Sequence, residues 1–212
     1  TALHIRENLL YKDHPDTATS YSNMGLVYAC LGDYENALEY SKKALNNREI
    51  VLGCNHHDTA VSYNNVGIVH SYMGHCKEAI SFQTKALSII ENLLGIYHSD
   101  TASAYSNLGI NYCHIGQNQK ALDLCLKALE IRKQLFGDKH PDTSNSYGHV
   151  GDVYGLIGDN TKAMEYNTRA LELCRLLFGE NNIKTADKYC NVGMIHANLG
   201  NFEKAIENET KA

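Results

Sequence analysis

The sequence has few of the features that mark nucleic-acid-binding or membrane proteins. Its 212 residues carry 19 Lys and Arg against 24 Asp and Glu, a net charge of −5, and the basic residues form no cluster. Nucleic acid and anionic membrane surfaces bind through such clusters, so we expect neither partner. No apolar run approaches the roughly 18 residues needed to cross a bilayer, and no charged-then-apolar leader opens the chain. We therefore expect a soluble, cytoplasmic chain.

The cysteines do not indicate a disulfide framework or a metal site. There are seven, an odd number, at irregular places in the sequence. No Cys-x-x-Cys motif occurs, nor any Cys/His pairing at zinc spacing. We expect small buried or half-buried thiols in a reducing cytosol, with no metal and no cofactor.

A short motif repeats at a constant interval of 42 residues. His14-Pro-Asp-Thr-Ala returns, with small changes, at His56, His98 and His140. A fixed period of about 20–50 residues is typical of repeat proteins, in which one unit cannot bury its apolar face alone and neighbouring units stack. Function must then be sought on the surface of the stack.

Each unit reads as a helix, a turn and a second helix. In residues 14–55, Pro15 and Asp16 suit the first turn of a helix that we expect to begin near residue 15. Gly25 is small enough for a partner helix to approach closely. Gly32 ends the first helix, Gly53 supplies a left-handed residue that ends the second, and glycines recur at both places in the later units.

The spacing of Tyr21, Met24-Gly25, Tyr28, Ala37 and Ala44 resembles the tetratricopeptide repeat. With its longer second helix and its Gly-x-x-His-Pro-Asp linker, the unit is similar to the 42-residue subclass found in kinesin light chains. The resemblance implies an all-α, right-handed superhelical solenoid of antiparallel helix pairs with about five repeats. Residues 1–212 would be a single array, divided into the end of a preceding second helix (1–13) and the repeats 14–55, 56–97, 98–139, 140–181 and, partial, 182–212.

The last repeat and the chain ends depart from this regular pattern. Asn182-Ile-Lys-Thr185 replaces the His-Pro-Asp-Thr start, so we expect a weaker beginning for the fifth first helix. The chain starts and stops partway along second helices. We interpret it as a piece of a longer array with apolar surface exposed at each end, which could stack head to tail.

The resemblance implies that the first helix of each pair lines the inner, concave wall. Asparagine occupies the same place in four of the five copies, two residues before the packing glycine: Asn23, Asn65, Asn107 and Asn191. A carboxamide both donates and accepts hydrogen bonds, so a row of them could hold the backbone of an extended peptide. The alternative is that these asparagines only bond between adjacent first helices.

The positions expected on the inner wall also include apolar residues that could anchor a ligand, and none of these positions is Lys or Arg. The other candidate peptide-binding residues of this wall are Leu26, Asn64, Ile68, Tyr72, Ser106, Ile110, His114, His149, Asp152, Met194 and Asn198. Because no Lys or Arg falls on this face, we expect neither a carboxylate clamp nor an acidic-tryptophan cargo groove. A neutral to weakly basic protein or peptide with apolar anchors fits better.

The fourth repeat has extra glycines in its first helix. Gly148 and Gly155 lie seven residues apart, on one face, and each costs a helix about 1 kcal/mol relative to Ala. They could form a notch for a bulky ligand side chain beside His149 and Asp152. Drift in a tolerant repeat is the alternative.

These observations favour a binding protein over an enzyme. No nucleophile, base and orienting group come together, so we expect no catalysis. We predict a scaffold or adaptor that binds an extended partner segment in its concave groove. The alternatives are an assembly element that self-associates by end-to-end stacking, or a regulatory array attached to a catalytic domain outside this sequence.

Overall fold

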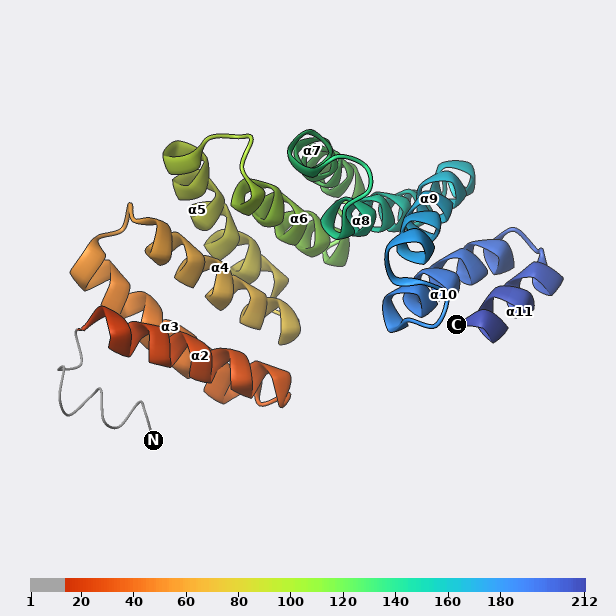
Figure 1. Cartoon of the computed structure of the whole chain (residues 1–212). Helices are drawn as coiled ribbons and strands as arrows, with labels where there is room; N and C mark the ends of the chain where they lie inside the picture. Colours follow the sequence, from red (N-terminus) through yellow and green to blue (C-terminus); the bar gives the residue numbers. More distant parts are fainter. Residues whose placement is uncertain (1–13) are drawn as a thin grey trace. The chain divides into compact units, whose positions relative to one another are not determined.

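The computed structural model describes residues 14–212, and all regular structure in that range is helical (Figure 1). The predicted helix end over residues 1–13 lies outside the described residues. The chain divides into two compact units, residues 1–95 and 96–212. Each unit has its own core of buried side chains.

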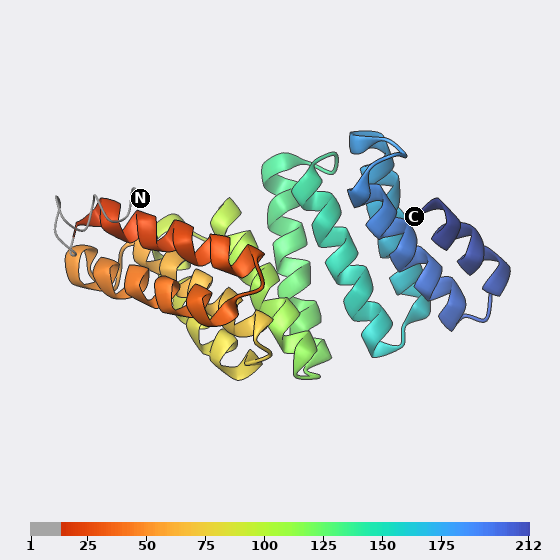
Figure 2. The ribbon, with the colours of Figure 1, turned by 90° about the horizontal axis from the view of Figure 1, so that it is seen from below.

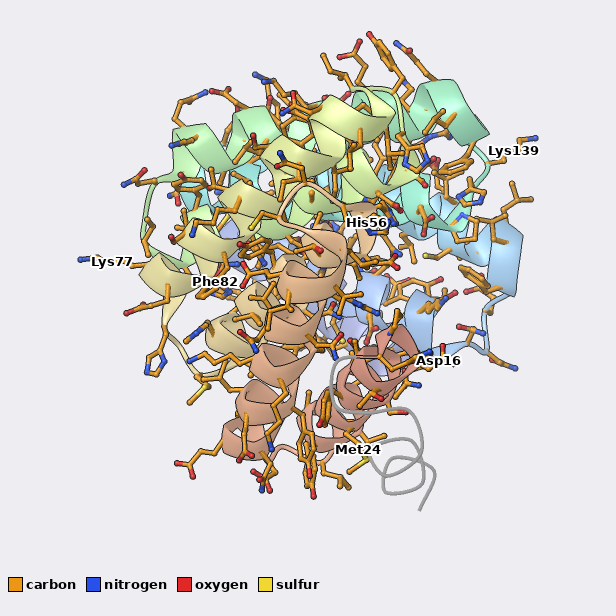
Figure 3. All side chains as sticks on the ribbon, turned by 90° about the vertical axis from the view of Figure 1, so that its left-hand side faces the viewer. Asp16, Met24, His56, Lys77, Phe82 and Lys139 are labelled. Atoms are coloured by element: carbon orange, nitrogen blue, oxygen red, sulfur yellow. The ribbon has the colours of Figure 1, made fainter. Side chains whose placement is uncertain are left out.

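The first unit contains two helix pairs. They are α2 (Pro15–Cys30) with α3 (Tyr34–Leu52) and α4 (His57–Tyr72) with α5 (Cys76–Leu94). Helix α3 also contacts α4, which joins the two pairs into one packed body. The junction is filled by Leu45, Tyr63, Val66 and Ala86, which are all buried. Phe82, labelled in Figure 3, packs against this core and stacks on His70 with ring centroids 5.5 Å apart.

The second unit continues the same hairpin pattern (Figure 2). Its helices are α6 (Ser99–His114), α7 (Asn118–Phe136), α8 (Pro141–Ile157), α9 (Asn160–Phe178), α10 (Ile183–Asn198) and α11 (Phe202–Lys211). Each helix contacts the next one in the chain, and α8 also contacts α6 and α10. We call α2, α4, α6, α8 and α10 the A helices, and the helices that follow them the B helices.

The repeated His-x-Asp-Thr motif holds each linker at two points. The histidine Nδ1 accepts a hydrogen bond of 3.1–3.2 Å from the backbone N–H two residues later and so caps the A helix, at His14, His56, His98 and His140 (His56 is labelled in Figure 3). In the linkers before α4 and α8, the threonine hydroxyl donates to the carbonyl of the glycine that ends the preceding B helix. The pairs are Thr59 with Gly53 at 2.8 Å and Thr143 with Gly137 at 2.9 Å.

The fifth A helix begins as firmly as the others, contrary to the sequence prediction. The Asn182 side-chain oxygen accepts a 3.0 Å hydrogen bond from the Lys184 N–H, in the place of the histidine nitrogen. Thr185 donates to Gly179 O at 2.8 Å, as its equivalents do. The prediction of a weak start was wrong because asparagine is itself a strong N-cap residue.

Glycine serves the two purposes that the sequence indicates. At Gly25 an added Cβ would lie 2.7 Å from Ser41 Oγ and 3.2 Å from Ala37 O, so only glycine lets α3 approach this closely. At Gly53 the backbone has φ 84° and ψ 165°, a positive-φ conformation, although an extended one and not the left-handed helical one that we expected. The predicted all-α fold of antiparallel helix pairs, in about five repeats, is confirmed.

Candidate functional site

In the first unit, the predicted residues lie on the A helices α2 and α4. Leu26 is 53% exposed and Tyr72 is 60% exposed. Asn23 is exposed, whereas Asn64, Asn65 and Ile68 are half-buried. Apolar and amide side chains therefore share this surface.

A cavity of about 280 Å³ opens among α2, α3 and α4, and it brings together four of the predicted residues. Its lining consists of Gly25, Leu26, Ala29, Cys30, Tyr34, Ser41, Asn65, Ile68, Val69 and Tyr72. None of these residues is charged. The rings of Tyr34 and Tyr72 are stacked, with centroids 5.6 Å apart. Asn23 and Asn64, also predicted, are not part of this lining.

Ser41 lines this cavity with a small side chain. The same place is taken by Gln83, Cys125 and Asn167, each of which lies against the packing glycine of its A helix. Gln83, for example, is 1% exposed, and its Cγ would be 2.6 Å from a Cβ added at Gly67. We did not single out Ser41 from the sequence. Comparing residue size at equivalent positions of the repeats would have found it.

A buried arginine supports A helices from behind in both units: Arg48 of α3 donates to Ser62 Oγ of α4 at 2.8 Å in the first, and Arg132 does so more extensively in the second. Arg132 of α7 is 9% exposed. Its Nη1 donates to Ser106 Oγ at 3.1 Å and to Ser146 Oγ at 2.6 Å, and its Nη2 donates to Ser103 Oγ at 3.3 Å. The guanidinium thus joins α7 to both α6 and α8. Burial lowers the pKa of Arg132, and Asp142 partly opposes this effect.

A second basic group corrects two predictions about this wall. The Lys188 ammonium nitrogen would lie 2.8 Å from a Cβ added at Gly148, so the lysine covers the inner face of α8. The expected wall without Lys or Arg is therefore wrong for the second unit, because Lys188 of α10 reaches it. The expected notch beside Gly148 is also wrong, since Lys188 occupies that space. Beside Gly155 only Ala163 Cβ, at 3.9 Å, would be near an added Cβ.

His149 and Asp152 lie close to the positive charge of Lys188. Burial first, and then the positive charges of Lys188 and Arg132, lower the pKa of His149 to about 4. Asp152 is exposed, yet neighbouring atoms remove part of its hydration and raise its pKa, while Lys188 lowers it. Within residues 14–212 no hydrogen bond joins His149 to Asp152, so the two do not form a dyad. This geometry gives no support to a catalytic role.

The asparagine ladder behaves differently in the two units. Asn191 Nδ2 donates to Asp152 Oδ1 at 3.1 Å, which ties α10 to α8 and fits the structural alternative. Asn107 also has an interaction partner within the protein. In contrast, the side chains of Asn23 and Asn65 make no hydrogen bond to any other residue in the described part of the chain. Free amides therefore remain on α2 and α4.

The other predicted residues of the second unit range from buried to exposed. Ser106 is buried and bonded to Arg132, so it is not available to a ligand. Ile110 is half-buried, His114 and Asn198 are exposed, and Met194 is 56% exposed. Over residues 14–212 no group of three or more His, Cys, Asp or Glu could hold a metal ion, and no helix has the length and apolar character to span a bilayer.

Stacked helix hairpins with shared caps and glycine contacts define a helical-repeat protein. The sequence matches the tetratricopeptide repeat family over residues 1–50, 16–92 and 100–175, and again over 186–212. The chain therefore belongs to the tetratricopeptide repeat family, whose members are typically non-catalytic scaffolds for protein partners. No curated protein matches the sequence.

Solved structures support the kinesin-light-chain type of repeat. The chain is similar to the nearly identical TPR-like repeats of a kinesin light chain candidate from Podosopora anserina, with a TM-score of 0.78, 17% identity, and coverage of 93% of this chain and 94% of the other. It is also similar to BtubC (BKLC) from P. vanneervenii, with a TM-score of 0.79, 18% identity, and coverage of 97% and 81%. At identities of 17% and 18% the similarity concerns the fold alone. The predicted resemblance to kinesin-light-chain repeats is confirmed for the fold.

Proposed function

We propose that this protein is a scaffold that binds an extended segment of a partner protein along the inner faces of its A helices, and that it acts by binding alone. The observation that carries the proposal is Asn65. Its half-buried amide has no hydrogen-bond partner in the described chain, and it lies on the rim of an apolar cavity. A peptide N–H or C=O would satisfy this amide.

The exposed apolar side chains would supply most of the affinity. Burying a side chain the size of Leu26 or Met194 contributes about 1.5–3 kcal/mol, whereas a hydrogen bond to an amide contributes about 1 kcal/mol. Binding must also offset the entropy of ordering the peptide, so several anchors are needed. The amides would then fix the register of a segment held mainly by apolar contacts.

The charge of the partner segment would differ between the two units. The cavity lining in the first unit has no charged residue, which favours a neutral, apolar segment there. The second unit presents Lys188 close to Asp152, so it can meet either sign of charge. The predicted neutral to weakly basic partner thus remains our proposal for the part that crosses α2 and α4.

The direct test is a selection of random displayed peptides on the wild-type protein and on an Asn65→Ala variant. Asn46→Ala is the matched control, since Asn46 is exposed on α3. We expect peptides enriched on the wild type to bind about 2- to 12-fold more weakly to Asn65→Ala, the loss of one hydrogen bond, and equally to the control. A wild-type protein that enriches no peptide would contradict the proposed function.

A further inference from the structure

The cavity among α2, α3 and α4 has room for a bulky amino-acid side chain. We propose that it is a specificity pocket that receives one bulky, uncharged apolar side chain of the partner, of the leucine, methionine or phenylalanine type. This inference rests on the proposed function, because it assumes that the partner lies along α2 and α4. It goes further by naming the chemistry that the first unit selects.

The volume of the cavity supports a single side chain as its occupant. At about 280 Å³ it is just smaller than the roughly 300–1,000 Å³ of pockets that hold whole drug-sized ligands. It is also far larger than the roughly 30 Å³ share of one water molecule. Water in a space lined by Leu26, Ile68 and Val69 finds few hydrogen-bond partners, so an apolar group that replaces it gains affinity.

The lining also determines which side chains are excluded. A Lys or Glu side chain in the pocket would lose hydration without meeting an opposite charge, because all the lining residues are neutral. The stacked rings of Tyr34 and Tyr72 provide a flat apolar wall. Asn65 lies at the same site with a free amide, where it can bind the main chain beside the inserted residue.

The other repeats show how the pocket can be closed without disturbing the fold. Gln83, at the equivalent position of the second repeat, packs against Gly67 and is 1% exposed. Ser41→Gln therefore places a side chain that this scaffold already accommodates. Ser81→Gln is the matched control, because Ser81 is exposed on α5. Leu26→Ala, at a 53% exposed position, removes one wall without affecting the buried core.

The test uses N-acetyl-leucine methylamide as the probe, with N-acetyl-lysine methylamide as the charged comparison. Binding is followed by NMR of the Ile68 and Leu26 methyl groups in the whole chain. We expect saturable shifts with the leucine probe, with a dissociation constant in the millimolar range, and none with the lysine probe. Ser41→Gln should weaken binding at least about tenfold and Leu26→Ala severalfold, whereas Ser81→Gln should leave it unchanged.

The possible outcomes test the specificity pocket separately from the proposed binding of an extended peptide. No saturable shift on the wild type, or equal binding by Ser41→Gln, would overturn the pocket. If displayed peptides are enriched on the wild type and bind Ser41→Gln equally, the peptide groove stands and the pocket falls. If the leucine probe binds as expected but no peptide is enriched, the pocket stands and the extended-peptide function fails.

Discussion

Arg132 of α7 donates a 2.6 Å hydrogen bond to the hydroxyl of Ser146 on α8, and the same guanidinium reaches two serines of α6. One side chain from a B helix thereby holds two successive A helices at a set separation. Hydrogen bonds from a charged donor are stronger than neutral ones, at about 1.5–3 kcal/mol each. The inner wall of the second unit thus depends on a residue that lies behind it.

Removing this guanidinium should destabilise the second unit. We expect Arg132→Ala to lower the free energy of unfolding by about 2–4 kcal/mol, because buried serine hydroxyls lose their partner. Arg169→Ala is the control: Arg169 is exposed and pairs only with Glu172, at 3.3 Å, so its loss should cost less than about 1 kcal/mol. Urea denaturation measures both. Equal effects would show that the arginine bridge does not stabilise the fold.

Replacing a capping histidine should depend on whether the new residue can accept a hydrogen bond. His140→Ala should cost about 1 kcal/mol, because the Asp142 N–H loses its acceptor. His140→Asn should be nearly neutral, since Asn182 caps α10 in this way already. Thermal denaturation of both variants is the measurement. An asparagine variant as unstable as the alanine variant would mean that ring packing on Phe136, 4.4 Å away between ring centroids, is the main contribution.

The half-buried His149 of α8 should make stability depend on pH. The pKa of His149 is about 4 in the folded protein and near 6.5 when unfolded, so between these values the unfolded chain binds more protons. Stability therefore falls as the pH is lowered from 6.5 to 4, by about 2–3 kcal/mol in total. Asp152, whose pKa is raised in the folded state, acts in the opposite direction.

His149→Asn isolates this contribution, because asparagine is the usual residue at this place. Denaturation curves between pH 4 and 7 should be flatter for the variant than for the wild type. The Asp152 term is present in both proteins and cancels in the difference. Identical pH profiles would contradict the low pKa, which NMR titration of the His149 ring would measure directly.

Two glycines of A helices should respond to alanine in opposite ways. At Gly109 a Cβ would lie 2.6 Å from Cys125 Sγ and 3.3 Å from Ala121 O, so Gly109→Ala should destabilise the protein by about 1–3 kcal/mol. At Gly155 the nearest atom is 3.9 Å away, so Gly155→Ala should stabilise by about 0.5–1 kcal/mol through helix propensity. Denaturation midpoints of the two variants should move apart. A shift in the same direction would refute the packing argument.

The sequence predicted the features that recur in each repeat. The 42-residue period, the linker histidines and the glycines place helix starts, helix ends and close contacts, because these depend on backbone geometry within one unit. Gly25 against α3 is an example that the structure confirms. Helix pairs could therefore be assigned without any knowledge of their neighbours.

The missed features depend on side chains that cross between helices. Arg132 is on a B helix, yet its guanidinium supports A helices, and Lys188 of α10 covers Gly148 of α8. Their positions in the sequence give the direction of Cβ but not where a long side chain ends. Ser41 was missed for a different reason: a cavity results from what a residue does not fill, and only comparison with Gln83 reveals it.

The hydrogen bond from threonine to glycine limits which insertions and deletions the linkers can tolerate. In the linkers before α4, α8 and α10 the hydroxyl reaches back six residues, to Gly53, Gly137 and Gly179. Adding or deleting one residue there would change the spacing between the threonine and the glycine and so separate donor from acceptor. Substitutions on the exposed helix faces leave this hydrogen bond intact. Changes in linker length would break it, so the number of residues in each of these linkers is constrained.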